Sequence, residues 1–154
     1  MLNRDNINSK HASIDQILEK GKFIKVDKSN FDAEVTGGKS VLFFYDVSGK
    51  SLPSLNFYLA EIFAEFSRKF PQIKFLAYKA FVDRLNEDDY VRNFGFIGVP
   101  SYAYYKDGFI LLGYFGGPSS DREYHSFRSH IERELRYLAI SSTIIYGGRI
   151  IHLN

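Results

Sequence analysis

The fold is decided by the stretch Asn93-Phe-Gly-Phe-Ile-Gly-Val-Pro-Ser-Tyr-Ala-Tyr-Tyr-Lys-Asp-Gly108. Its Val99-Pro100 step predicts a tight turn. An aromatic strand is expected to follow over 101–105, and Phe109–Phe115 returns as a second strand. Lys106-Asp107-Gly108 lies between them, and Asp-Gly is a strong hairpin signal. We therefore predict a β-hairpin that is entered through a proline turn.

Outward from this hairpin, strand and helix patterns alternate along the chain. The unbroken apolar run Val41-Leu-Phe-Phe-Tyr45 suits a strand that is buried on both faces of a central sheet. A long helix is expected from Pro53 to about Phe70, because apolar residues recur there at helical spacing and proline is tolerated in a first turn. The other expected elements are strands over Phe23–Asp27 and Ile73–Val82, short helices over Ser29–Val35 and Asn86–Phe94, a first helix from Ser13 to Gly21, and a last amphipathic helix opened by Ser119.

The order of these elements and the Val-Pro turn together resemble the thioredoxin-like superfamily. The resemblance covers roughly residues 22–138 and implies an α/β fold, with a central mixed sheet flanked by helices. Residues 1–21 are expected to form a polar segment with a short helix. Residues 139–154 lie beyond the resemblance and are expected to form a short C-terminal β extension.

The chain contains no cysteine, although thioredoxins carry a Cys-x-x-Cys motif at the start of their long helix. An ungapped alignment places Gly49-Lys50-Ser51-Leu52 over that motif, and a shift of one residue places Ser48-Gly49-Lys50-Ser51 there. Both registers stay open. Neither contains the thiolate that disulfide exchange requires. In the simplest interpretation, Ser48, Gly49 and Ser51 form a turn and cap the helix.

Two further positions bear on the missing chemistry. The resemblance places Phe43 where thioredoxins carry a buried aspartate, the proton acceptor for the resolving cysteine, and a phenyl ring cannot accept a proton. Lys79 matches the family's lysine beside that carboxylate. Because its family partner is absent, we expect Lys79 to be a strand-edge or surface cation.

The best-matched element is the proline turn. The resemblance implies that its Val99-Pro100 peptide bond is cis, a form that costs only about 0.5–1 kcal/mol before proline. In the family, the residue before the proline offers its backbone N–H and C=O to an extended peptide, and here that residue is Val99. Gly116 matches a glycine that lets the bound chain approach closely. The resemblance thus implies a shallow partner surface around the site loop. Its candidate residues are Tyr45, Val47, Ser48, Gly49, Lys50, Ser51, Ile97, Val99, Pro100 and Gly116.

Composition narrows the classes of partner. The 154 residues carry a formal net charge of +2, which is too balanced to favour nucleic acid or a membrane surface. The four histidines show no metal-ligand spacing, so we expect neither a metal nor a cofactor. No apolar run reaches the roughly 18 residues of a membrane span, and the first residues lack the apolar core of a secretory signal. These features lead us to expect a cytoplasmic protein.

Three functions fit this sequence. The first is a redox-inactive thioredoxin-like protein that binds a polypeptide partner as an adaptor or chaperone-like module, with no enzymatic activity. The second is a thiol–disulfide oxidoreductase seen as a variant in which Ser48 and Ser51 replace native cysteines. The third is a structural or oligomerisation subunit. The native codons at positions 48 and 51 distinguish the second function from the other two.

The third function depends on the C-terminal segment. Residues 143–153 read as two short strands joined by Gly147-Gly148, and six of these eleven residues are large apolar side chains. A hairpin of two strands is marginal by itself, so this one needs a surface to lie on. We expect that surface to belong to the same domain or to a second copy in a homodimer.

Overall fold

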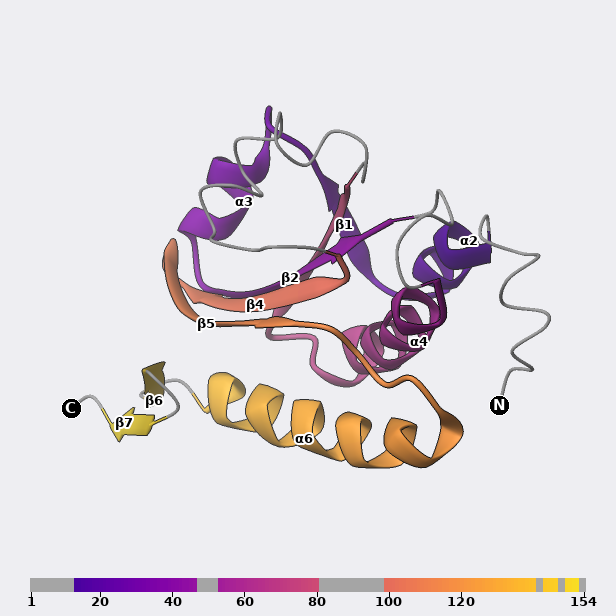
Figure 1. Cartoon of the computed structure of the whole chain (residues 1–154). Helices are drawn as coiled ribbons and strands as arrows, with labels where there is room; N and C mark the ends of the chain where they lie inside the picture. Colours follow the sequence, from indigo (N-terminus) through magenta and orange to yellow (C-terminus); the bar gives the residue numbers. More distant parts are fainter. Residues whose placement is uncertain (1–12, 47–52, 81–98, 141–142, 147–148, 153–154) are drawn as a thin grey trace.

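A mixed sheet of five strands forms the centre of the computed structural model, which describes residues 13–46, 53–80, 99–140, 143–146 and 149–152 (Figure 1). β1 and β2 run parallel to β3, whereas β4 runs antiparallel to β2 and to β5. This arrangement confirms the predicted α/β class. Across the sheet the order is β1 (Phe23–Val26), β3 (Lys74–Lys79), β2 (Lys39–Tyr45), β4 (Ser101–Lys106) and β5 (Phe109–Phe115).

The middle strand is β2, as its apolar run predicts. All five residues from Val41 to Tyr45 are buried. Val41, Phe43 and Tyr45 contribute to one core cluster, whereas Leu42 and Phe44 contribute to another. Successive side chains of a strand point to opposite faces of the sheet. Because both faces are covered here, every residue of this run lies in a core, which explains why the run contains no charged residue.

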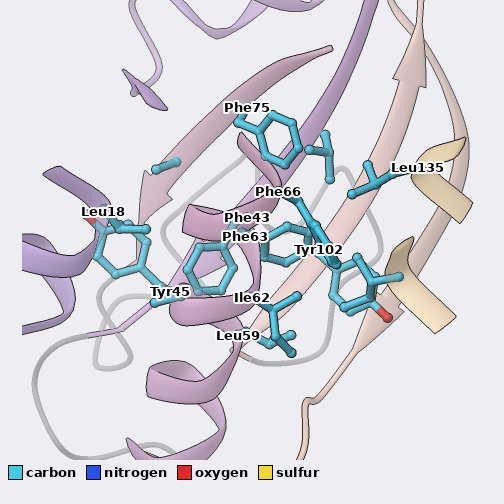
Figure 2. Packing of buried hydrophobic residues seen from close by; sticks show 14 of the residues in the cluster. Leu18, Phe43, Tyr45, Leu59, Ile62, Phe63, Phe66, Phe75, Tyr102 and Leu135 are labelled. Carbon is cyan, nitrogen blue, oxygen red and sulfur yellow. The ribbon is translucent and has the colours of Figure 1, made fainter. Parts of the chain in front are cut away.

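Helices cover both faces of the sheet in the described parts of the chain (Figure 1). α2 (Ser13–Lys20), α4 (Pro53–Lys69) and α6 (Asp121–Ala139) share a core with one face, and α3 (Phe31–Thr36) packs on the other. The core on the α4 side is largely aromatic, as Figure 2 shows. The ring of Phe63 on α4 lies 5.4 Å, centroid to centroid, from both Phe43 and Tyr102. α4 is therefore held on the sheet mainly by aromatic contacts.

The first helix belongs to this same core. Ile14 and Leu18 of α2 are buried in the cluster that α4 forms with the sheet. Gly21 ends the helix, and its N–H donates to the Leu18 carbonyl at 3.1 Å. A Cβ at Gly21 would lie 2.7 Å from Ser67 Oγ and 3.0 Å from Ala64 Cα, so a side chain there would push α2 away from α4. The core thus extends into the segment that the sequence assigns to residues 1–21.

The predicted hairpin is present between β4 and β5. Asp107 and Gly108 connect the strands with φ angles of 50° and 87°. Two positive φ values are typical of the turn that matches the twist of a two-residue hairpin, which explains the Asp-Gly pair. The Asp107 side chain also accepts a hydrogen bond from the Gly38 N–H at 3.0 Å. This contact fixes the hairpin against the loop that leads into β2.

α6 begins as its sequence predicts. The Oγ of Ser120 accepts a hydrogen bond from the Glu123 N–H at 3.3 Å, and Glu123 Oε2 accepts one from the Ser119 N–H at 2.9 Å. Side chains and backbone therefore satisfy each other's groups at the helix start, in an arrangement close to a capping box but with Glu123 bound to the residue before the cap. The predicted apolar stripe is confirmed as well. Ile131, Leu135 and Leu138 are buried, and Tyr124 and Phe127 pack against the same core.

The clearest boundary differences between the prediction and the structure are in two elements. The short helix after β1 begins at Phe31 instead of Ser29, because Ser29 and Asn30 bond to the preceding turn. The Ser29 N–H donates to Asp27 Oδ1 at 2.7 Å, and Asn30 Oδ1 accepts from the Asp27 N–H at 2.8 Å. β3 ends at Lys79, short of the predicted Val82, which lies outside the described residues along with the helix predicted over 86–94.

The C-terminal segment forms a separate antiparallel pair of strands. β6 (Thr143–Tyr146) pairs with β7 (Arg149–His152), with Ile144 opposite Ile151. The predicted β extension is confirmed, and β6 lies beside α6 and β5 (Figure 1). The same domain thus supplies at least part of the surface that this pair needs. A homodimer through residues 143–153 stays a prediction.

Candidate peptide-binding edge

The candidate site lies where β2 ends and β4 begins. Phe44 pairs with Ser101, and Ser101 pairs with Phe115, so the next residues, Tyr45, Pro100 and Gly116, meet at one end of the sheet. The Val99–Pro100 peptide bond is cis, as predicted. The Gly116 N–H donates to the Pro100 carbonyl at 2.8 Å, which ties the proline turn to the end of β5. Four of the ten predicted site residues are thus brought together.

The other six predicted site residues lie outside the described parts of the chain. They are Val47, Ser48, Gly49, Lys50, Ser51 and Ile97. The two registers of the loop over the Cys-x-x-Cys position therefore both remain open.

Of the four predicted residues at this edge, Gly116 is the most accessible, and the other three are buried. Tyr45 and Val99 each expose 2% of their surface, and Pro100 is buried. Gly116 is half-buried with a φ of +106°, and an added Cβ would meet no atom within 4 Å. Glycine is required at this position by its backbone angle, because residues with a side chain rarely adopt that φ. A chain that docks on these residues would meet the Gly116 backbone first.

The next glycine has a different role. A Cβ at Gly117 would lie 2.8 Å from Leu59 Cγ and 3.2 Å from the Leu55 carbonyl oxygen, both on α4. The lack of a side chain therefore lets the chain after β5 pass close to α4. Gly116 is therefore needed for its backbone angle, and Gly117 is needed for the close contact with α4.

Phe43 occupies the interior of the core. It exposes 1% of its surface, stacks on Tyr45 with ring centroids 5.5 Å apart, and lies in the aromatic cluster of Figure 2. No proton acceptor is present at this position. The place that the resemblance assigns to a catalytic carboxylate is filled by a ring that packs against α4.

Lys79 fits one of its two predicted alternatives, because its side chain is partly exposed at the surface, but it is not at a sheet edge. It ends β3, which lies between β1 and β2 and is therefore not a strand at the sheet edge. Its Nζ lies 2.9 Å from Asp15 Oδ2 on α2, so the lysine has a partner. The other carboxylate oxygen, Oδ1, accepts a hydrogen bond from the Tyr45 hydroxyl at 2.9 Å. Burial and the contact with Asp15 raise the pKa of the Tyr45 hydroxyl well above its usual range.

Asp15 was not predicted as a partner, because this residue comes from the segment placed ahead of the domain. It lies in the first turn of α2, where an acidic residue needs no tertiary role to be favoured. Its contacts to Tyr45 and Lys79 span 30 and 64 residues of sequence. No local pattern signals a pairing of that range.

A second missed contact is a buried polar pair beside the loop. The Asp46 N–H donates to Asn56 Oδ1 at 2.8 Å, and both residues are buried. Asn56 lies in the first turn of α4. The pair joins the end of β2 to the start of the long helix, on the two sides of residues 47–52. Its only sequence signal is a polar residue on the apolar face of a helix.

Metal sites and membrane-spanning helices are absent from the described parts of the chain. Among the described residues, no group of three or more histidine, aspartate or glutamate side chains could hold a metal ion. Within those residues, too, no helix combines the length and the apolar character needed to cross a membrane.

The fold has clear counterparts among solved structures. A thioredoxin from Trypanosoma brucei brucei matches with a TM-score of 0.54 and 14% identity, over 74% of this chain and 91% of that one. Mitochondrial thioredoxin 3 from Saccharomyces cerevisiae gives 0.52 and 14%, over 74% and 93%. Thioredoxin f from spinach chloroplast gives 0.52 and 17%, over 71% and 93%.

Comparisons of sequence give no such match. No family model and no curated protein matches this chain. At 14–17% identity, the likeness to thioredoxins concerns the fold alone. The sheet order, the proline turn and these counterparts agree on one architecture. The protein therefore has the thioredoxin-like fold, and it contains none of the cysteines with which a thioredoxin exchanges disulfides.

Proposed function

We propose that this protein is a redox-inactive thioredoxin-like module that binds a polypeptide in extended conformation at the edge formed by Val99, Pro100 and Gly116. One observation carries the proposal: the proline turn and the glycine beside it are held together by the bond from the Gly116 N–H to the Pro100 carbonyl, while the cysteines are absent. Backbone groups and a glycine suit an extended chain, which is recognised largely through its own main chain. The adaptor or chaperone-like role follows from binding without chemistry.

The rest of the site supports binding more than catalysis. Phe43 removes the proton acceptor, and Lys79 is engaged by Asp15. A Cys-to-Ser variant of an oxidoreductase would be expected to keep its acid–base partner, since only the sulfurs would have been replaced. The Phe43 position therefore favours the binding module over the variant enzyme.

The experiment compares two glycines that are alike except for their place. Gly116→Asn and Gly38→Asn each put a side chain at a positive φ, and an added Cβ would contact nothing within 4 Å at either position. The backbone strain should therefore be of the same kind at the two positions, about 1–3 kcal/mol. Only Gly116 lies at the proposed edge, because Gly38 precedes β2 at the opposite end of that strand.

Peptides are first selected on the wild-type protein from a displayed library of random sequences, and their affinity is measured by fluorescence anisotropy. We expect Gly116→Asn to weaken binding at least tenfold and Gly38→Asn to leave it within twofold. Failure to select any peptide, or equal binding by the two variants, would contradict the proposal.

A further inference from the structure

A buried carboxylate links α6 to the hairpin of β4 and β5. Glu134 on α6 exposes 8% of its surface. Its Oε2 atom accepts a hydrogen bond from the Tyr114 hydroxyl at 2.6 Å, and its Oε1 atom accepts one from the Tyr104 hydroxyl at 3.0 Å. His130, one turn earlier on α6, brings its Nε2 atom to 3.2 Å from Oε1. A buried carboxylate is costly without such partners, so these contacts connect the helix firmly to both strands.

The two tyrosines differ in where they lie along the hairpin. Tyr114 is on β5, two residues before Gly116. Its ring stacks on that of Tyr102, directly opposite on β4, with centroids 5.0 Å apart. Tyr102 is itself two residues after Pro100, whereas Tyr104 lies two residues farther from this end of the sheet. Of the two hydroxyls that Glu134 binds, the one of Tyr114 is therefore nearer to the candidate edge.

The end of β5 is the part of the candidate edge that most needs support. β5 is an outer strand of the five-stranded sheet, with β4 as its only hydrogen-bonded neighbour among the described strands. The Gly116 N–H donates to the Pro100 carbonyl just beyond Phe115, the last paired residue. The end of a strand that is paired on one side opens more readily than the centre of a sheet. A hydrogen bond from Tyr114 to α6 limits this opening.

The Tyr114 hydroxyl is suited to this role. Burial, followed by the hydrogen bond with Glu134, raises the pKa of the Tyr114 hydroxyl well above its usual range. The hydroxyl therefore keeps its proton and remains a donor to the carboxylate. Hydrogen bonds to a charged acceptor are stronger than those between neutral groups.

We propose that Glu134 is a positioning residue for the candidate edge: through Tyr114 it holds the end of β5, and with it Gly116, against the proline turn. Its effect on binding rests on the function proposed above, whereas its effect on the backbone does not. In this way α6 influences how often the edge is closed. His130, which is half exposed, contacts the same carboxylate from the surface.

The test compares two tyrosines that bind the same carboxylate. Tyr114→Phe and Tyr104→Phe each remove one hydroxyl and keep the ring. Exchange of the Gly116 amide with solvent is measured by NMR on the full chain labelled with ¹⁵N. The Ala80 amide, which donates to the last residue of β2 at the same end of the sheet, is the internal reference. Relative to Ala80, we expect Tyr114→Phe to speed up Gly116 exchange by about tenfold or more, and Tyr104→Phe to change it by less than about threefold.

The opposite results would overturn the proposal. Unchanged Gly116 exchange in Tyr114→Phe, or equal acceleration in the two variants, would mean that Glu134 only stabilises the packing of α6. A cycle with Glu134→Ala tests the route. Once the acceptor is removed, Tyr114→Phe should change Gly116 exchange by less than about twofold further. A further tenfold rise would show that the hydroxyl acts through another group and would also overturn the proposal.

A peptide selected on the wild-type protein adds a measurement of binding. Tyr114→Phe should weaken its affinity by about twofold or more and Tyr104→Phe should leave it unchanged, because only the closed edge binds. Equal affinities of the wild type and Tyr114→Phe would overturn the positioning role, even if the exchange rates differ. Failure to select any peptide would instead contradict the proposed function, and the exchange rates alone would then decide whether Glu134 holds Gly116 in place.

Discussion

Two halves of the region that corresponds to the thioredoxin site differ in how well they match the resemblance. The half around Pro100 has the cis bond, the neighbouring glycine and the hydrogen bond that connects them, as the resemblance to thioredoxins implies. The half around Phe43 lacks every chemical group that the resemblance implies, except Lys79. The first half depends mainly on backbone geometry and the second on the identity of a few side chains. Backbone geometry is fixed by the whole fold, so it persists when the chemistry is absent.

The half around Phe43 also differs from the resemblance in where its charged groups lie. A ring occupies the place of the carboxylate, and a new carboxylate, Asp15, reaches Lys79 from a helix that precedes β1. The charge pair now lies at the margin of the core, with both side chains partly exposed. Partial exposure keeps the desolvation cost of the pair low. The interior meanwhile gains an uninterrupted aromatic cluster.

The largest expected difference between the two halves is in redox chemistry. The purified protein should not accelerate the reduction of insulin disulfides by dithiothreitol above the rate without protein. Exchange needs a thiolate nucleophile, and the chain contains none. Turbidity of the precipitating insulin chain reports the rate, with an ordinary thioredoxin as the positive control. Turnover at a thioredoxin's rate would show that the comparison is mistaken.

The second prediction introduces a carboxylate into the half around Phe43. Phe43→Asp should lower the free energy of unfolding by about 3–5 kcal/mol or prevent folding, because it removes a buried ring and introduces a buried charge. Phe43→Leu is the control, with an expected loss of about 1–2 kcal/mol. Urea denaturation followed by circular dichroism measures both. A Phe43→Asp protein within 1 kcal/mol of the leucine variant would mean that the carboxylate finds water or Lys79 at this site.

Local sequence patterns were sufficient for the elements and insufficient for the contacts between them. The apolar run Val41–Tyr45, the Asp107-Gly108 turn and the serines before α6 each act within a few residues, and each was predicted. The partner of Lys79 was not, because Asp15 is 64 residues away in sequence and carries only the signal of an ordinary helix start.

The candidate site divides in the same way. The cis turn could be predicted because a proline and its neighbours carry the signal in consecutive residues. The burial of Tyr45 and Val99 could not, since it depends on how α2 and the second core cluster cover these residues.

The smallest effect is expected from the ion pair between Asp15 and Lys79. Asp15→Asn and Lys79→Met, combined in a double-mutant cycle, should give a coupling energy of about 0.5–1 kcal/mol. The two atoms are 2.9 Å apart, but both side chains are partly exposed, so solvent screens their attraction. Tyr45→Phe should cost about 1 kcal/mol separately, because it leaves Asp15 Oδ1 without the tyrosine hydroxyl.

Salt distinguishes these two contacts. The Asp15–Lys79 coupling should fall when the urea titrations are repeated in 1 M salt, where the screening length is about 3 Å, whereas the loss in Tyr45→Phe should change little, because the hydroxyl carries no charge. Glu19→Gln, on the exposed side of α2, controls for general changes in the charge of that helix. Additive effects of Asp15→Asn and Lys79→Met at low salt would mean that the charge pair does not help to hold α2, which would then depend on other contacts such as the burial of Ile14 and Leu18. The ion pair of Asp15 with Lys79 would then not stabilise the half around Phe43.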